Sequence, residues 1–219
     1  KMKKLNYTLI SLLLLSTLIL AAPTIYGPTG LIEMPTADSL QYKEFNIGLD
    51  YNIAAQSIAS QNAAQYYYKF NLGTFKGIEL GLVGGSVPTE GVFINLKYYL
   101  MSDNSRYPIS IAIGIENVTS ISRSSAYLVA SKKFQGGLHG HFGFKAFIQE
   151  NQLDSCLMLG GEYFLSDEFS IASDIIGEGR QYKINGGLRY YFADDLFFRA
   201  SVVDVTDSQG NGVFYNVGV

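Results

Sequence analysis

The feature that most constrains the fold of this chain is an alternation of apolar and polar side chains that recurs in successive short stretches. Twelve such stretches of about eight to twelve residues follow one another from Tyr42 to Val219, each ended by turn-forming residues. In the clearest one, isoleucine occupies every second position from Ile109 to Ile115, and small or polar residues lie between. A period of two is that of a β-strand whose two faces meet different surroundings. The pattern predicts an all-β chain.

Strands of this length and alternation are typical of a transmembrane, antiparallel, up-and-down β-barrel. We expect about twelve strands, with ten or fourteen as alternatives. The faces are less distinct in residues 125–134, 156–165 and 196–204, which we also assign as strands. The last stretch, residues 214–219, lacks a final aromatic residue, and we expect it to be clipped by a few residues.

Charged side chains fall on one face of the stretches, which we assign to the lumen. They comprise Glu44, Asp50, Lys69, Glu79, Lys97, Glu116, Lys145, Glu162, Asp174, Lys183, Arg189 and Arg199. The two signs are balanced, which predicts ion pairs across a narrow lumen that leave only a small channel. A solute-lining role is the alternative. Tyr67 and Tyr99 on the same face would either pack or stack on sugar rings.

The connections differ in length. Short ones at residues 74–76, 166–167 and 193–194 are expected at one rim, and longer ones at residues 54–62, 102–106 and 117–124 at the other. Outer-membrane barrels carry short turns at the periplasmic rim and long loops at the outer rim.

The N-terminus has the three regions of a secretory signal. Lys1, Lys3 and Lys4 precede an apolar run over residues 9–20, and Ala21 and Ala22 follow it. We predict a signal peptide at residues 1–22, an N-terminal plug or rim segment at 23–41 and a barrel at 42–219; an uncleaved anchor is the alternative. Without the three lysines, 13 basic residues face 19 acidic ones, a net charge of −6 that argues against nucleic acid as a partner.

The segment before the first strand is rich in glycine, proline and threonine. Its notable residues are Gly27, Pro28, Gly30, Leu31, Ile32, Pro35 and Thr36. The glycines permit a positive φ or close backbone approach, and the prolines stiffen the turns. The apolar residues need a dry environment, so we predict that the segment folds into the barrel and partly plugs it. The alternative is a periplasmic rim turn that orients the first strand.

Residues 26–37, followed by Phe45, Asn46, Ile47 and Gly48, resemble the N-terminal signature of the YjbH-like family of outer-membrane proteins. The resemblance is specific over residues 27–51, and this chain is shorter than the long members of the family. It implies a barrel in the outer membrane of a diderm bacterium that supports exopolysaccharide export or envelope assembly. The expected partners are outer-membrane lipid, the barrel-assembly machinery and a polysaccharide or oligosaccharide. A small porin-like diffusion channel is the second hypothesis.

The sequence offers little for catalysis. Cys156 is the only cysteine, and His139 and His141 are the only histidines, two residues apart on one predicted strand. No nucleophile elbow, phosphate loop or zinc-spaced cluster accompanies them. We predict no enzyme activity, cofactor or metal, and a barrel hydrolase using either histidine is the third hypothesis. Alternation alone also fits a soluble lipocalin-like barrel, although that fold would bury the charges away from water.

Overall fold

The computed structural model describes residues 22–55, 64–75, 77–86, 91–102, 108–120, 123–149, 152–178, 181–193, 196–208 and 212–219. The predicted signal peptide at residues 1–22 lies outside them except for Ala22. Of residues 149, 152 and 178 only the backbone is described.

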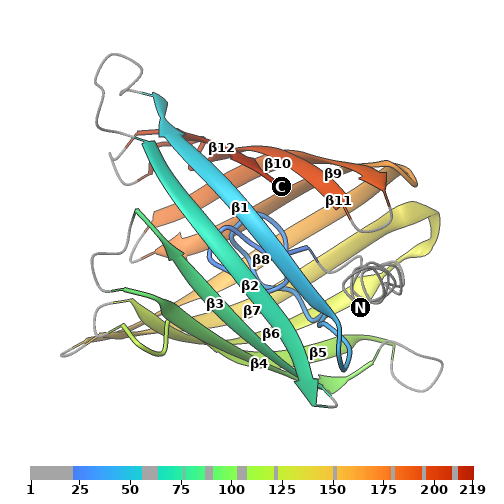
Figure 1. Ribbon diagram of the computed structural model, residues 1–219, viewed down its shortest axis with the longest axis horizontal. Coiled ribbons are helices and arrows are strands. Elements are labelled where there is room, and N and C mark those ends of the chain that lie inside the picture. The colour runs from blue at the N-terminus through green and yellow to red at the C-terminus, as the bar shows by residue number, and fades with distance from the viewer. Residues whose placement is uncertain are drawn as a thin grey trace, which may run out of the picture.

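Twelve antiparallel strands form one closed barrel (Figure 1). Each strand pairs with its neighbours in sequence, and β12 pairs with β1 to close the wall. The all-β fold and the twelve strands predicted from the alternation are therefore confirmed, including the three less distinct stretches. The strands are β1 (Phe45–Ala54), β2 (Ala64–Phe75), β3 (Ile78–Gly85), β4 (Phe93–Met101), β5 (Ser110–Glu116), β6 (Ser124–Lys133), β7 (Leu138–Gln149), β8 (Gln152–Ser166), β9 (Phe169–Glu178), β10 (Gln181–Ala193), β11 (Leu196–Val203) and β12 (Phe214–Gly218). A short 3₁₀ turn, η2 (Gln135–Gly137), joins β6 to β7.

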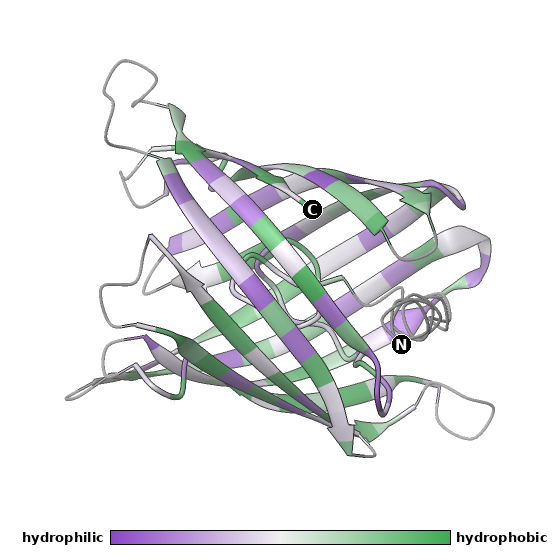
Figure 2. Cartoon of the chain, in the orientation of Figure 1, coloured by the Kyte–Doolittle hydropathy of each residue, from purple (hydrophilic) through white to green (hydrophobic). Residues whose placement is uncertain are grey.

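The alternation in sequence becomes an inner and an outer face. In β1, Ile47, Leu49 and Tyr51 are exposed, whereas Gly48 and Asp50 between them are buried. Figure 2 shows the same change of hydropathy from residue to residue along the strands. The apolar side chains face outwards and the charged ones inwards, which is the reverse of a soluble lipocalin-like barrel.

One connection between strands lies at a different rim from the one predicted from its length. In an up-and-down barrel successive connections alternate between the two rims, so the β4–β5 connection lies at the same rim as the β2–β3 and β8–β9 turns. The prediction placed residues 102–106 at the opposite rim and was wrong, because connection length does not determine the rim, whereas strand order does. Residues 103–107 themselves lie outside the described part. The four irregularities of strand register, in β2, β4, β8 and β10, also lie at this rim.

Residues 22–41, here called the lumen segment, run inside the ring of strands (Figure 1). The segment forms two tight turns rather than a strand. In the first turn Thr24 N–H donates to the Pro28 carbonyl at 2.8 Å, and in the second Leu31 N–H donates to the Met34 carbonyl at 2.9 Å. Ile25 N–H donates to the Ile32 carbonyl at 2.8 Å and joins the two turns. The segment is therefore a small folded unit enclosed by the barrel.

Candidate functional site

The lumen segment brings peptide groups into the barrel without a β-ladder to satisfy them. A buried N–H or C=O group needs a hydrogen-bond partner, and here the charged side chains of the wall provide many of them. Carboxylates accept from N–H groups, and cations donate to carbonyl oxygens. Because the segment presents both N–H groups and carbonyl oxygens, the lumen contains both carboxylates and cations.

Asp174 on β9 makes the densest of these contacts. Its Oδ2 accepts hydrogen bonds from three successive backbone N–H groups, those of Ile32, Glu33 and Met34, at 2.9, 2.9 and 3.0 Å. Its Oδ1 accepts from Asn185 Nδ2 at 2.6 Å. Successive N–H groups that converge on one anion form a nest, a backbone arrangement suited to negative charge. Asp174 thus fixes the second turn of the segment.

Glu79 on β3 fixes the other end of the segment in the same way. Its Oε1 accepts from Thr29 N–H at 3.0 Å, and its Oε2 accepts from the Thr29 hydroxyl at 2.9 Å and from Leu40 N–H at 3.1 Å. The carboxylate therefore joins two positions eleven residues apart and holds the segment where it approaches β1.

Four cations bind the carbonyl oxygens of the segment. Arg189 donates to the Gly30 and Leu31 carbonyls at 2.6 and 2.8 Å. The other three contacts follow the same pattern from three further strands: Arg199 to the Pro23 carbonyl at 2.8 Å, Lys69 to the Thr24 carbonyl at 2.6 Å, and Lys97 to the Thr29 carbonyl at 2.9 Å. Lysine and arginine are donors only, so carbonyl oxygens suit them.

Sequence reasoning omitted several neutral wall residues that hold the segment. Asn71 and Asn95 donate to the Gly27 and Tyr26 carbonyls at 2.8 and 3.0 Å, and Ser131 Oγ accepts from Ala37 N–H at 2.9 Å. The signal was present, because Asn71 and Asn95 each lie two residues from a predicted lumen lysine and therefore share its face.

The apolar side chains of the segment pack in two clusters against inward-facing apolar residues of the wall. Ile25 and Ile32 belong to one cluster, and Met34 and Ala37 to the other. Gly27, at φ +114°, lies so close to the wall that an added Cβ would sit 2.4 Å from Val83 Cγ2. Thr36 N–H donates to the Thr29 carbonyl at 3.1 Å, and Gly30 and Pro35 form an isolated β-bridge. All seven residues singled out between 27 and 36, Pro28 included, are buried.

The ion pairs of the wall differ from the predicted pairing across the lumen. Asp50 pairs with Lys69 on the adjacent strand and with Arg199 two strands away. Lys145 pairs with Glu116, and Arg189 with Glu162 at 3.0 Å, again between strands two apart. The charges pair along the wall because the lumen segment fills the space between opposite sides. Of the twelve predicted lumen residues ten are buried, and Glu44 and Lys183 are half-buried.

Two further ion pairs join the segment to the wall. Lys183 Nζ on β10 lies 3.0 Å from Glu33 Oε2, and Lys133 Nζ on β6 lies 3.5 Å from Asp38 Oδ1. Burial of Asp38 opposes its ionisation, but the positive charge of Lys133, with smaller contributions from other nearby groups, keeps the pKa of this carboxyl below its ordinary value. The negative charge of Glu33, together with burial, raises the pKa of Tyr26 well above its ordinary value. Both effects favour a neutral tyrosine and an ionised aspartate inside the barrel.

Within the part of the chain that the structure describes, the two histidines contact a buried serine and an aromatic ring. His141 Nδ1 lies 2.7 Å from Ser131 Oγ, but both residues are buried, and this hydroxyl oxygen also accepts from Ala37 N–H. His139 packs its ring against Phe164 with centroids 5.1 Å apart. Cys156 is buried in the cluster that contains Met34. Within the described residues, no group of three His, Cys, Asp or Glu side chains is placed to hold a metal ion.

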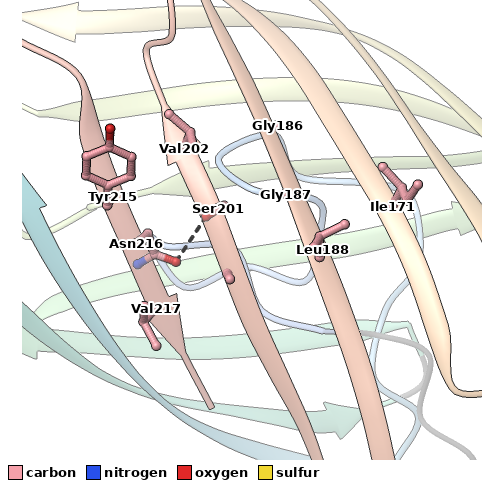
Figure 3. Close-up of a pocket in the computed structure, with 10 residues that line it drawn as sticks. Ile171, Gly186, Gly187, Leu188, Ser201, Val202, Tyr215, Asn216 and Val217 are labelled. Atoms are coloured by element: carbon pink, nitrogen blue, oxygen red, sulfur yellow. Dashed lines mark hydrogen bonds between the residues drawn. The ribbon is translucent and has the colours of Figure 1, made fainter. Parts of the chain in front are cut away.

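A separate hollow of about 460 Å³ lies over β9 to β12 (Figure 3). The hollow is lined by residues of the exposed apolar face, which include Ile171, Leu188, Tyr215 and Val217. Gly186 also lines it, and no atom lies within 4 Å of the place where a Cβ on Gly186 would be. The hollow belongs to the outer surface, so the lumen remains the candidate site.

Among the described residues, no helix is both long and apolar enough to span a membrane. The chain matches no protein-family model and no curated protein.

Proposed function

We propose that this chain is an integral β-barrel of the outer membrane of a diderm bacterium, that residues 22–41 close its lumen, and that it serves exopolysaccharide export or envelope assembly. The observation that carries the membrane location is the inverted distribution of side chains, apolar outside and charged inside. A wall of this kind exposes to hydrocarbon what a soluble protein would bury.

Exposed aromatic residues near the strand ends add support, because such residues form girdles at both interfaces of membrane barrels. Tyr51, Tyr66 and Tyr182 lie near one rim. Phe45 and Phe192 lie near the other, where the rings of Phe45 and Phe70 stack with centroids 6.4 Å apart.

Two matched arginine substitutions test the membrane location. Leu128, in the middle of β6, is 48% exposed, and Val118, beyond the end of β5, is 50% exposed. In a membrane barrel, Leu128→Arg lowers the free energy of unfolding from lipid vesicles by about 2–4 kcal/mol, and Val118→Arg lowers it by about 1 kcal/mol or less. In a soluble barrel both are surface substitutions with equally small effects, and that result would refute the proposal.

The role in export or assembly is supported by the resemblance of residues 27–51 to the YjbH-like signature. Deleting the gene in its host should lower the polysaccharide released from the cell while leaving its synthesis intact. A diffusion channel is the competing function, and the filled lumen argues against it. The intact refolded protein should therefore stay closed in a planar bilayer, whereas steady conductance would favour the channel. The absence of catalysis stays a prediction.

A further inference from the structure

The wall keeps most of its charges paired without help from the lumen segment. Lys69 and Arg199 both pair with Asp50, and Arg189 pairs with Glu162, so each of these cations has a wall carboxylate as well as a segment carbonyl. Lys97 faces Glu79 directly in the β3–β4 ladder. Removing the segment would therefore leave these cations with a counter-charge on the wall.

Asp174 is the exception. Its contacts are the three N–H groups of the segment and the neutral amide of Asn185, and within the described residues no ion pair joins it to a cation. A buried carboxylate without a counter-ion is costly unless hydrogen bonds compensate it. The nest of residues 32–34 is thus the compensation that the wall itself does not supply, and Asp174 is the group that most needs an occupant.

The segment has the properties of a separable ligand. It is held together by its own hydrogen bonds, including Gly30 N–H to the Ala22 carbonyl at 2.8 Å, and most wall contacts reach its backbone. Its link to β1 passes through Gln41 and Tyr42, which are both exposed.

We infer that the inner wall is a peptide-binding site built around Asp174, and that residues 22–41 are its reversible occupant. The ligand class is a short turn-forming peptide that presents three successive free N–H groups to one carboxylate. The inference rests on the proposed closed membrane barrel and goes further, because a closed barrel could equally contain a permanent core.

Cutting the link tests this in the folded protein. A protease site placed between Gln41 and Tyr42 of the full chain is cleaved after refolding into lipid vesicles. The cut fragment should dissociate while the barrel keeps its heat-modifiable migration on a gel, and a planar bilayer should then show conductance. A fluorescein-labelled synthetic peptide of residues 22–41 should rebind at one per barrel and abolish the conductance.

The contribution of Asp174 is measured on the same cut barrel. Asp174→Asn should weaken peptide binding by about tenfold, the effect of losing charge from hydrogen bonds of this kind. A matched control is the double variant Glu116→Gln, Lys145→Met, which removes a buried ion pair from another part of the wall and should leave binding unchanged. Should Asp174→Asn fail to fold, N-methylation of the Glu33 amide in the peptide removes one of the three donors and leaves the barrel intact.

Three results would overturn the inference: release of the fragment only when the barrel unfolds, equal binding of a scrambled peptide, or equal binding of the N-methylated one. Failure of the uncut chain to insert into vesicles would instead refute the proposed function. The two failures are therefore distinguishable.

Discussion

Asp174 and Glu116 are both carboxylates on inward faces of the barrel, and each is 1% exposed. Glu116 is bound by its own wall, because Lys145 pairs with it and the Ser125 hydroxyl donates to it at 3.2 Å. Asp174 is bound mainly by the lumen segment, through N–H groups about 140 residues away in sequence. Two positions with the same sequence pattern therefore have different roles, one in wall stability and one in holding the segment.

The difference follows from what lies opposite each carboxylate. The β5 to β7 side presents mainly apolar residues to the segment, such as Ala112, Tyr127 and Val129, so its charges pair among themselves. The β9 to β11 side meets the second turn of the segment, where Asp174 accepts from three N–H groups and Arg189 donates to the Leu31 carbonyl at 2.8 Å. The comparison predicts that substitutions on the two sides change different measurable properties.

The largest effect is expected for Glu116→Gln. Removing one member of a buried ion pair leaves Lys145 charged and uncompensated, which lowers the free energy of unfolding by about 3–5 kcal/mol. Urea unfolding in lipid vesicles measures it. The double variant Glu116→Gln, Lys145→Met should recover most of the loss. If the double variant is as unstable as the single one, the pair is not what Glu116 contributes.

Asp174→Ala should have a smaller and more local effect. It leaves the N–H groups of Ile32, Glu33 and Met34 without their acceptor, which costs about 3 kcal/mol of segment docking. Hydrogen exchange at these three amides should accelerate while exchange in the strands stays unchanged, because the wall ladders are intact. Uniform acceleration throughout the barrel would contradict the distinction between wall and segment.

These two carboxylates also show how far sequence reasoning extends. The alternation around Glu116 and Asp174 places both inside, because a period of two fixes the face of every residue once one face is known. It does not identify partners, since the donors to Asp174 come from a segment with no periodicity. The same limit explains why the predicted ion pairing across the lumen was wrong. That prediction assumed that the space between opposite strands was empty. Predicting the rim at which the β4–β5 connection lies required the order of the strands rather than the length of the connection.

Glycines with a positive φ provide a third test. Gly27 at φ +114° belongs to the lumen segment, and an alanine Cβ there would lie 2.4 and 2.5 Å from Val83 and Asn95. Gly136 at φ +78° lies in η2 at the rim, with no atom within 4 Å of such a Cβ. Gly27→Ala should cost about 1–3 kcal/mol through strain and overpacking, and Gly136→Ala about 1 kcal/mol through φ alone. Equal losses would indicate that the lumen yields to the added methyl group.

The smallest effect concerns pH at the rim. The carboxyl of Asp38, half of an ion pair with the partly exposed Lys133, has a pKa below its ordinary value. The stabilisation it provides is therefore fully present above the ordinary pKa of an aspartate and is lost as the pH falls through the lowered value. Because the pair is partly exposed, the difference amounts to about 1 kcal/mol or less. The chain loses free energy of unfolding between neutral and strongly acidic pH, and Asp38→Asn should make this loss smaller by about this amount. Urea unfolding at the two pH values measures the difference. A variant that loses as much stability on acidification as the parent chain would show that Asp38 holds no favourable charge interaction, and that the segment is fixed by its backbone contacts to Glu79 and Asp174.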